Sequence, residues 1–449
     1  MILFVGDGMG ISTITAGRIY RGQQLGGTGE EHVLAFETFE NVALVKTYNT
    51  DMQVPDSAGT MTAIVTGEKT RAGVLSVGAD VERGDCEAAL ANPLRTLFEI
   101  AVEHGLRTGV VTTTTVTHAT PAAGYAHAPD RDWEADSNVP EEAKLAGCRD
   151  IAQQLIDFNE GKGIDVVLGG GRQNFRPVSA VDPEYADQYG KRNDETDLIA
   201  HWQKEAPNRQ FVWNLEQFNA LRPDTPDQVL GLFEPSHMKF EADRADDAGG
   251  EPSLAEMTRF AINKFANSRH GYLLVVEGGR IDHAHHFGNA YRAMTDMTAL
   301  DDAVQVAKDL TDPEDTLILV TADHSHTLTI AGYPPRGNPI LGTVPIPQAY
   351  AGFMKPYTTL TYANGPGYKQ PPADLSEADT QAKDYRQAAA VALPVETHAG
   401  EDVAAYAQGP NASALRGVIE QNRIFDVLYG ALFREPTADN QITTQEDVR

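Results

Sequence analysis

The chain of 449 residues is 41% hydrophobic, which is enough to bury a large core, and its apolar runs are too short to span a membrane. Its 36 basic and 64 acidic residues give a formal charge of −28, which repels nucleic acid and anionic membranes and excludes nonspecific DNA binding. An anionic substrate would therefore need strong local positive charge, which bound metal ions can supply.

Short β-branched runs alternate with helix-like stretches along the chain. This alternation predicts an α/β fold with a central, mostly parallel β-sheet flanked by helices, in a single domain that spans residues 1–449. The predicted strands are Ile2–Val5, Gly109–Thr114, Asp165–Leu168, Gln210–Trp213, Tyr272–Val276, Thr316–Val320 and Val403–Ala407.

Residues 332–394 interrupt this alternation, since proline, glycine and tyrosine are frequent there and the apolar periodicity fades. We interpret this stretch as an inserted surface subdomain. Strand and helix then return, and we expect the polar tail at 435–449 to be loose. The predicted helices are Pro93–His104, Glu141–Phe158, Ser253–Ser268, Ala290–Leu310 and Val418–Leu432.

The cysteine content, the start of the chain and the acidity bear on the compartment and the source of the protein. Cys86 and Cys148 are too few and too far apart for a cysteine metal site, which leaves one disulfide or two thiols. No leader peptide stands before the apolar run at Ile2, which is compatible with a leader that has been removed. The excess of acidic residues is typical of solubility or of a salty habitat, and we hypothesise a halophilic or marine source.

The first predicted strand ends in the segment GDGMG, which contains Asp7. Ligands in open α/β sheets collect at the carboxyl ends of strands. The flanking glycines let the backbone turn sharply, so that the Asp7 carboxylate can project toward a shared site. The alternative is an ordinary turn or a helix cap, which aspartate also favours.

Ser57 stands in the segment PDSAGT, ahead of a run that is compatible with a helix. One interpretation is an N-terminal cap, a position that serine and aspartate often fill. The other is a nucleophile at the positive end of a helix, where the dipole and a metal ion would stabilise its alkoxide. Both interpretations can hold at once.

The segment VTHATPAA follows the strand at 109–114, and it includes Thr120. The Thr120 hydroxyl could bind a metal ion. Arg131, eleven residues further on, could clamp two phosphate oxygens with its planar guanidinium group. Taken alone, Arg131 would be interpreted as a solvated surface residue.

The segment EGGRIDHAHH, after the strand at 272–276, gives the strongest local signal. If it is helical, Asp282 and His286 share one helix face and can chelate a single zinc ion. Three histidines within four residues are difficult to explain by core packing, so we favour metal binding here. Glu277 stands at the strand end and could hold a harder ion through oxygen.

The strand at 316–320 leads into TADHSH, where Asp323 and His324 can offer oxygen and nitrogen to one ion. An ordinary polar loop is an equally good interpretation of this segment alone. His398, in ETHAG, would likewise usually be structural.

Taken together, these segments resemble the alkaline phosphatase family across nearly the whole chain. Details such as GLFEPSHMKFE and YANGPGY are closer to the vertebrate-type branch than to the enteric bacterial one. The resemblance implies hydrolysis of phosphate monoesters with release of inorganic phosphate. It is carried, in the order of the family, by VGDGMG, PDSAGTMTAIVTGEKT, VTHATPAA, VEGGRIDHAHH, VTADHSH and ETHAGEDVAAYAQGP.

The resemblance also implies a centre of two Zn²⁺ and one Mg²⁺. Asp7 would bridge two of the metals. The ligands that the resemblance implies are Asp282, His286 and His398 for the first zinc, Asp7, Ser57, Asp323 and His324 for the second, and Asp7, Thr120 and Glu277 for magnesium.

By the same resemblance, Ser57 attacks phosphorus to form a phosphoserine, water hydrolyses this intermediate, and Arg131 steadies the phosphate. His118 and His283 match positions close to the third metal and the phosphate, where other branches carry different side chains. We therefore expect these two histidines to support the site without binding a metal directly.

The vertebrate-type branch also has a calcium site, whose matches here are the Phe233 carbonyl, Glu234 and Glu251. Its remaining acidic ligand aligns with His201, and imidazole is a poor calcium ligand. The sequence therefore puts calcium binding in question.

Further expectations come from the resemblance alone. It pairs Cys86 with Cys148 as a disulfide, which implies an oxidising compartment such as the periplasm or the extracellular space. Residues 332–394 match the crown insertion of the family, which lies at a homodimer interface.

Two alternatives from different classes remain. A phosphodiesterase, a sulfatase or a cofactor-independent phosphoglycerate mutase would reuse the dinuclear centre, but Arg131 together with a full third-metal set favours monoesters. A non-catalytic phosphate- or metal-binding protein would not need Ser57, which this chain retains beside a full ligand set.

Overall fold

The computed structural model describes residues 1–433 except 226, 347, 349–353, 371–373 and 376–377, so the tail predicted at 435–449 lies outside the described residues. Within the described part, one large sheet contains β1 (Ile2–Gly6), β2 (Asn41–Lys46), β3 (Arg107–Thr115), β4 (Val166–Gly170), β5 (Arg209–Val212), β6 (Gln228–Leu232), β7 (Tyr272–Gly278), β8 (Ile318–Ala322), β16 (Val403–Gln408) and β17 (Gly417–Glu420).

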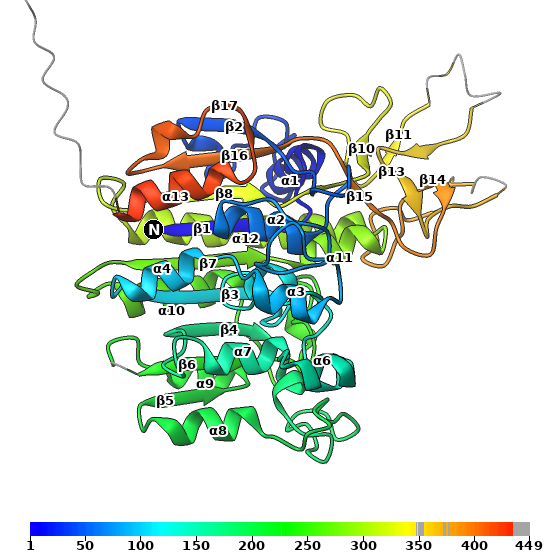
Figure 1. Ribbon diagram of the computed structural model, residues 1–449. Coiled ribbons are helices and arrows are strands. Elements are labelled where there is room, and N and C mark those ends of the chain that lie inside the picture. Colours follow the sequence, from blue (N-terminus) through cyan, green and yellow to red (C-terminus); the bar gives the residue numbers. More distant parts are fainter. Residues whose placement is uncertain (226, 347, 349–353, 371–373, 376–377, 434–449) are drawn as a thin grey trace, which may run out of the picture.

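These described strands lie side by side in the order β17-β2-β16-β8-β1-β7-β3-β4-β6-β5 (Figure 1). Neighbours run parallel except for β16, which is antiparallel to both β2 and β8. In the central strand β1, the side chains of Ile2, Leu3, Phe4 and Val5 are fully buried, so both faces of the sheet are covered. The α/β fold with a mostly parallel central sheet is confirmed.

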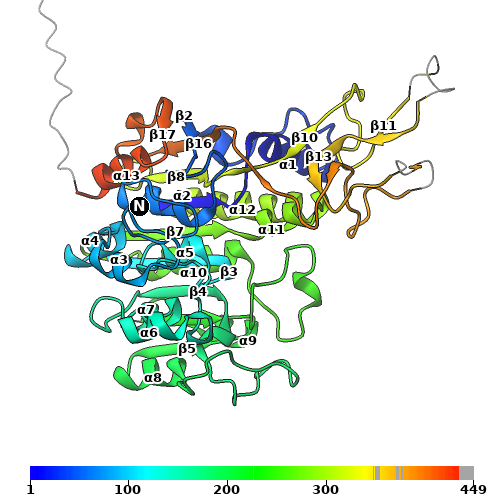
Figure 2. The same cartoon turned by 45° about the vertical axis from the view of Figure 1, so that its right-hand side comes forward.

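The helices cover the two faces of this sheet (Figures 1 and 2). Among them, α10 packs on β3 and β7, and α12 packs on β1, β7 and β8. Their bounds are α1 (Ile11–Gln24), α2 (Ser57–Thr66), α3 (Cys86–Ala91), α4 (Leu97–Glu103), α5 (Ala119–Ala122), α6 (Glu141–Ala146), α7 (Ile151–Asp157), α8 (Leu198–Glu205), α9 (Leu215–Ala220), α10 (Leu254–Phe265), α11 (Arg280–His286), α12 (Ala290–Leu310) and α13 (Arg423–Phe433).

None of the helices in the described part of the chain combines the length and the hydrophobicity that crossing a bilayer requires.

Much of the stretch 332–394 lies apart from the large sheet, in a lobe that projects to the right in Figure 1. Small sheets join β10 to β13 and β14, and β11 to β12, while β9 pairs with β15 closer to the body. The bounds of these short strands are β9 (Ser325–His326), β10 (Leu328–Ile330), β11 (Thr343–Val344), β12 (Tyr357–Thr358), β13 (Leu360–Gly365), β14 (Ala389–Ala392) and β15 (His398–Ala399).

Two predicted helices differ from the structure. The stretch 141–158 is divided into α6 and α7, because Gly147 adopts a left-handed conformation (φ 103°) that ends α6, and Asp150 caps α7 through Gln153 N–H. Residues 417–420 form strand β17, and helix α13 begins only at Arg423. Strands β2 and β6 were missed altogether.

The disulfide between Cys86 and Cys148 is confirmed. It links the start of α3 to the end of α6, and it lies in a small apolar cluster with Trp133, Val139 and Ala143. This cluster is separate from the main core, so the bridge holds an outlying segment to the body.

We expect the double variant Cys86→Ala/Cys148→Ala to lose about 2–4 kcal/mol of unfolding free energy, since the bridge closes a loop with a sequence separation of 62. Denaturant unfolding with saturating metals would measure the loss. A reductant should destabilise the wild type but leave the variant unchanged, and an equal effect on both would contradict the assignment.

Candidate active site

The carboxyl ends of β8, β1, β7 and β3 lie side by side, because these strands are parallel neighbours in the sheet. Asp7 directly follows β1, and Asp323 directly follows β8. Glu277 lies near the end of β7, opposite Val5 of β1. The strand-end motifs therefore meet at one edge of the sheet, where open α/β sheets place their ligands.

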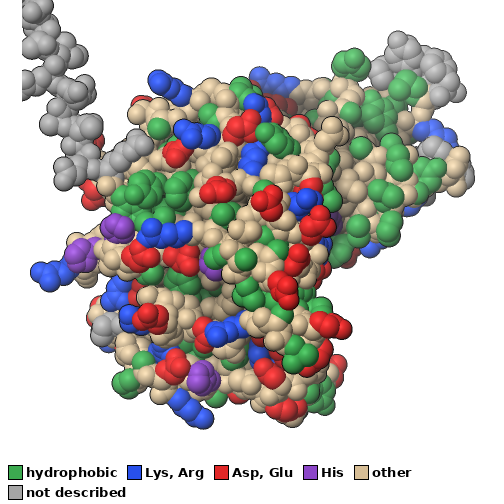
Figure 3. Space-filling view, in the orientation of Figure 1, with side chains coloured by type: hydrophobic (Ala, Val, Ile, Leu, Met, Phe, Trp, Pro, Cys, Tyr) green, Lys and Arg blue, Asp and Glu red, His purple; other side chains and the backbone are tan. Residues whose placement is uncertain are grey.

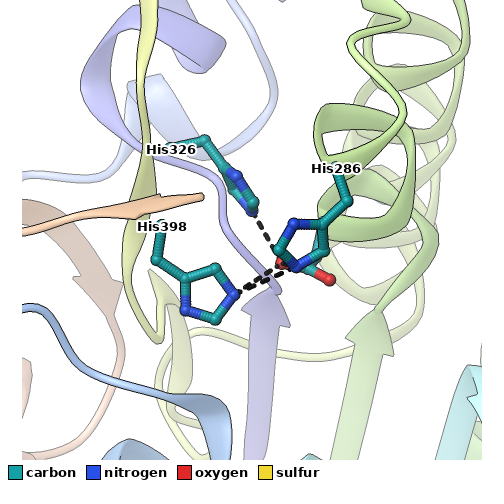
Figure 4. A group of neighbouring side chains, drawn as sticks. His286, His326 and His398 are labelled. Atoms are coloured by element: carbon teal, nitrogen blue, oxygen red, sulfur yellow. Dashed lines mark hydrogen bonds and ion pairs between the residues drawn. The ribbon is translucent and has the colours of Figure 1, made fainter. Parts of the chain in front are cut away.

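The first metal group consists of Asp282, His286 and His398 (Figure 4). Asp282 and His286 are four residues apart on α11, with Asp282 Oδ1 3.3 Å from His286 Nε2. His398 comes from β15, and its Nε2 lies 3.3 Å from the same oxygen and 3.2 Å from His286 Nε2. The structure thus brings together the three residues expected at the first zinc ion.

Hydrogen bonds fix which nitrogen of these two imidazoles carries the proton. His286 Nδ1 donates to the Glu396 carbonyl at 2.5 Å, and His398 Nδ1 donates to the Pro55 carbonyl at 2.8 Å. Because a carbonyl only accepts, Nδ1 carries a proton in each ring, and Nε2 is the nitrogen that faces Asp282. Two imidazole nitrogens and a carboxylate oxygen gathered at one point form a donor set that fits zinc.

His326 lies directly beside the first metal group, although sequence reasoning missed it (Figure 4). Its Nε2 lies 2.6 Å from Asp282 Oδ1, and its Nδ1 lies 2.5 Å from Glu396 Oε2. Although burial opposes it, Glu396 and Asp282 raise the pKa of His326 to about 10. His326 lies between the Asp282 and Glu396 carboxylates, where it can orient Asp282 toward the other members of the group.

His285 has a structural place, unlike its neighbours on α11. Its Nε2 lies 3.0 Å from Thr13 Oγ1 on α1, and its Nδ1 lies 2.8 Å from the Tyr362 hydroxyl on β13. Of the three clustered histidines, this one joins α11 to the projecting lobe.

The second metal group consists of Asp7, Asp323, His324 and Ser57, all of which are buried. His324 Nε2 lies 3.4 Å from Asp7 Oδ1 and 3.3 Å from Asp323 Oδ2. Ser57 Oγ lies 3.2 Å from His324 Nε2 and 3.5 Å from Asp7 Oδ1. Burial holds the pKa of His324 well below its usual range, so the ring is neutral and able to bind a metal.

The start of α2 positions Ser57. Asp56 is the cap of this helix, because its carboxylate accepts a hydrogen bond from Gly59 N–H at 3.2 Å. Ser57 is the first helical residue, which leaves its hydroxyl free to face the second metal group.

Arg131 is held from two sides close to Ser57. Its Nη1 donates to Asp56 Oδ2 at 3.2 Å, and its Nη2 lies 3.0 Å from His118 Nε2. Asp56 therefore caps the helix of the nucleophile and also fixes the arginine, a double role that sequence reasoning missed. Although burial opposes it, Arg131 and the N–H groups of Gly73 and Gly59 lower the pKa of Asp56.

The third metal group contains Asp7, Thr120 and Glu277. Asp7 Oδ2, Thr120 Oγ1 and Glu277 Oε1 are buried and have no hydrogen-bond partner among the described residues. Burial raises the pKa of Glu277 to about 7, and burial together with Asp323 raises the pKa of Asp7 well above its usual range. Three unpartnered oxygens around buried carboxylates fit a hard cation such as magnesium.

The imidazole of His118 lies beside the third group, and those of His283 and His237 lie next to it. The ring centroids of His118 lie 5.6 Å from those of both His283 and His237, and the last two are 4.4 Å apart. His237 Nδ1 accepts a hydrogen bond from Thr115 N–H at 3.1 Å. His118 forms a possible metal-holding group with Asp7 and Glu277, and its buried Nδ1 has no hydrogen-bond partner among the described residues, so it lies closer to the third group than the sequence led us to expect. His237 is an addition that the sequence did not reveal.

A separate acidic cluster lies where the loops that follow β4 and β6 meet. Glu184 and Asp247 join Glu234 in a group that could hold a cation. Burial, with further effects from Glu234 and Asp247, raises the pKa of Glu251 to about 9. His201 is not part of this group, since it lies on α8 and pairs with Glu205 at 3.1 Å. Glu184, and not His201, lies beside Glu234 in this group.

The chain as a whole matches known proteins in sequence. The sequence model of the family described as "Alkaline phosphatase" matches residues 1–433. The chain belongs to the alkaline phosphatase family. The resemblance predicted from the motifs is therefore confirmed, and the activity of the chain is that of a phosphomonoester hydrolase.

Curated relatives and a solved structure extend this result. The chain is 46% identical over 433 residues to tissue-nonspecific alkaline phosphatase of Gallus gallus, covering 94% of this chain and 82% of the relative. It is 43% identical over 437 residues to alkaline phosphatase of Gadus morhua, covering 94% and 89%. The alkaline phosphatase structure from Thermus thermophilus has a TM-score of 0.68 at 23% identity, covers 96% of this chain and 90% of that chain, and supports the fold.

Proposed function

We propose that the chain hydrolyses phosphate monoesters through a phosphoserine at Ser57, in a centre that binds two zinc ions and one magnesium ion. The observation that carries this proposal is the meeting of His286 Nε2, His398 Nε2 and Asp282 Oδ1 close to a buried serine. The unpartnered oxygens of the third metal group support magnesium.

The residues of the first and second metal groups would each hold one zinc ion. Those of the third metal group would hold the magnesium ion. Zinc ions bound there would act as Lewis acids that stabilise negative charge on oxygen. Ser57 Oγ forms a bond to phosphorus while the bond to the leaving oxygen breaks, and the serine proton ends on the alcohol that leaves. Arg131, fixed by Asp56, clamps phosphate oxygens with its guanidinium fork. Water then cleaves the Oγ–P bond, which releases phosphate and restores the serine.

Metal analysis of the purified protein alongside substrate comparison tests the proposal. We expect para-nitrophenyl phosphate to be hydrolysed much faster than bis-para-nitrophenyl phosphate or para-nitrophenyl sulfate, and zinc and magnesium to co-purify. Preference for the diester or the sulfate would favour another branch of the superfamily. Absence of turnover with both metals present would favour a binding protein.

His118→Asp is expected to tighten magnesium and to lower the need for added magnesium. A neutral imidazole adds no negative charge near the third metal group, whereas an aspartate could hold the ordered waters of magnesium. Turnover should also slow if release of phosphate becomes limiting. Magnesium titrations of metal-depleted protein would measure the change.

The control for this variant is His270→Asp, which makes the same change at an exposed position. It should leave magnesium dependence as it is in the wild type. Equal or weaker magnesium affinity in His118→Asp would refute the assignment of the third group. Because His118 and His283 are neighbours, a double variant should not be additive.

The Cys86–Cys148 bridge supports a periplasmic or secreted location, since such bridges persist in oxidising compartments.

The projecting lobe supports a homodimer, because it exposes large apolar side chains that include Tyr333, Val391 and Val395. Figure 3 shows hydrophobic side chains gathered on this lobe. Light scattering of the purified protein would give the oligomeric state.

We expect the protein to tolerate molar salt. Its formal charge of −28 makes the acidic side chains repel one another, and dissolved salt screens this repulsion. On the face in Figure 3, acidic side chains are spread over the body of the molecule. The melting temperature should hold or rise as sodium chloride is added. A steady fall would count against a halophilic adaptation.

A further inference from the structure

One partly buried carboxylate, that of Glu134, accepts three hydrogen bonds from two segments that are far apart in the sequence. Thr115 Oγ1 donates to Glu134 Oε2 at 2.7 Å, and the Thr117 hydroxyl donates to the same oxygen. The Asn174 amide, in a short 3₁₀ helix after β4, donates to it at 2.9 Å. Thr117 and Asn174 are almost fully buried, so without this oxygen their polar groups would lose a partner that water cannot replace.

The two threonines stand on the loop that leads into the third metal group. Thr115 is the last residue of β3, and its carbonyl accepts a hydrogen bond from His118 N–H at 2.9 Å. Thr117 directly precedes His118 and lies three residues before Thr120, which begins its own short helix with its neighbours in α5. A shift of this loop would therefore move both side chains that it presents to the third group.

The backbone around Glu134 is itself held in place. Ile151 N–H donates to the Trp133 carbonyl at 2.8 Å, and Ala152 N–H donates to the Glu134 carbonyl at 3.2 Å. Trp133 also packs in the apolar cluster that contains the disulfide. The Glu134 side chain thus reaches from a segment fixed against α7 to the loop after β3.

Of the three metal groups, only the third takes ligands from the loop after β3. The first group comes from α11 and β15, and the second comes from the ends of β1 and β8 and the start of α2. The third includes Thr120, whose Oγ1 is buried without a hydrogen-bond partner among the described residues. An anchor on this loop would therefore act on the third metal and leave the two zinc groups as they are.

We propose that Glu134 is a positioning residue for magnesium, which orients His118 and Thr120 toward the third metal group by pinning the loop before them. This inference rests on the proposed function, in which the third group holds magnesium. Glu134 is not itself among the side chains that could hold a metal ion in the described part of the chain. Loss of a residue that orients metal ligands typically lowers metal affinity by about 10–100-fold.

The test compares Glu134→Ala with Glu134→Gln. All three donors go to Oε2, so the glutamine can offer its amide oxygen to them while the charge is removed. The control is Glu37→Ala. The Glu37 carboxylate is also partly buried, and it accepts hydrogen bonds from Arg18 at 2.7 Å and from Leu34 N–H at 3.0 Å.

Each protein is depleted of metals, reloaded with zinc and titrated with magnesium chloride. The melting temperature follows magnesium binding without reference to activity, and metal analysis and phosphatase assays are made on the same samples. Glu134→Ala should need at least about tenfold more magnesium for half-saturation than the wild type, with its zinc content unchanged. Its turnover should recover at saturating magnesium.

The other two variants separate positioning from general stability. Glu134→Gln should stay close to the wild type in its need for magnesium, because the hydrogen bonds are restored. Glu37→Ala should melt at a lower temperature but keep the magnesium concentration for half-saturation of the wild type.

Three results would overturn the inference. They are a Glu134→Ala variant that binds magnesium as tightly as the wild type, an equal loss of magnesium affinity in Glu37→Ala, and a loss of zinc together with magnesium. If Glu134→Ala does not fold, Thr117→Val replaces it, since valine removes one donor and keeps the shape of threonine. Weaker magnesium binding in Thr117→Val then supports the inference, and unchanged binding overturns it.

Failure of the proposed function would look different. A wild type whose melting temperature does not respond to magnesium would overturn the magnesium site, and this inference with it. The three results above would leave magnesium binding and turnover of the wild type intact and would remove only the role of Glu134.

Discussion

Ser57→Ala is expected to lower phosphomonoester turnover by at least about two orders of magnitude, with zinc and magnesium still bound. Ser57 Oγ lies 3.2 Å from His324 Nε2 at the start of α2, where the helix dipole and the second metal group favour its alkoxide. The alanine removes this oxygen but none of the carboxylates or imidazoles of the centre. Steady-state kinetics and metal analysis of the same sample would test both halves of the expectation.

The matched control is Ser268→Ala, which removes a serine hydroxyl from an exposed turn. This variant should keep the turnover of the wild type. Near-normal turnover in Ser57→Ala would show that another group is the nucleophile. Loss of turnover together with loss of zinc would show that Ser57 is needed to hold the metals, which is also contrary to the expectation.

His326→Gln is expected to weaken zinc binding at the first metal group by about 10–100-fold. His326 links the Asp282 carboxylate to Glu396 through both of its ring nitrogens. Without this charged donor, Asp282 loses its orientation toward His286 and His398. Activity should therefore fall at limiting zinc and recover with excess zinc, which a zinc titration of metal-depleted enzyme would measure.

His285→Gln is a demanding control, because His285 is also buried and also bonded at both nitrogens, to Thr13 and Tyr362. It should reduce stability without changing the zinc concentration needed for half-maximal activity. If both variants shift this concentration equally, the effect comes from general loosening of α11. If neither does, His326 does not position the ligand.

The sequence predicted the residues that follow strands well, for a physical reason. Parallel strands end at the same edge of a sheet, so Asp7, Glu277 and Asp323 were expected to meet once the strands before them were identified. The helical spacing of Asp282 and His286 was equally readable, since residues four apart share a helix face.

Contacts between distant loops could not be predicted in this way. Asp56 holds Arg131, and Glu396 holds His326, across long separations along the chain. Neither the spacing of apolar residues nor a local motif predicts such pairs, because they meet only when the whole fold packs together. Glu184 was missed for the same reason. It lies in the loop between β4 and α8, and only the folded chain brings it to Glu234 and Asp247.

The split of 141–158 into two helices shows the limit of periodicity. Apolar spacing continues through this stretch, but Gly147 and the disulfide at Cys148 fix a turn that the pattern does not record. Similarly, the missed strands β2 and β17 pair with each other near one edge of the sheet, beyond β16. Their half-exposed, mixed sequences gave a weaker signal than the buried central strands.

The first metal group joins Asp282 and His286 on α11 to His398 on β15, and the second begins at Asp7. Most of the chain must therefore be synthesised before all residues of either group are present. A ribosome-bound fragment that stops before residue 398 cannot complete the first group. The first group can therefore bind a metal ion only after residue 398 has emerged and β15 has paired with β9.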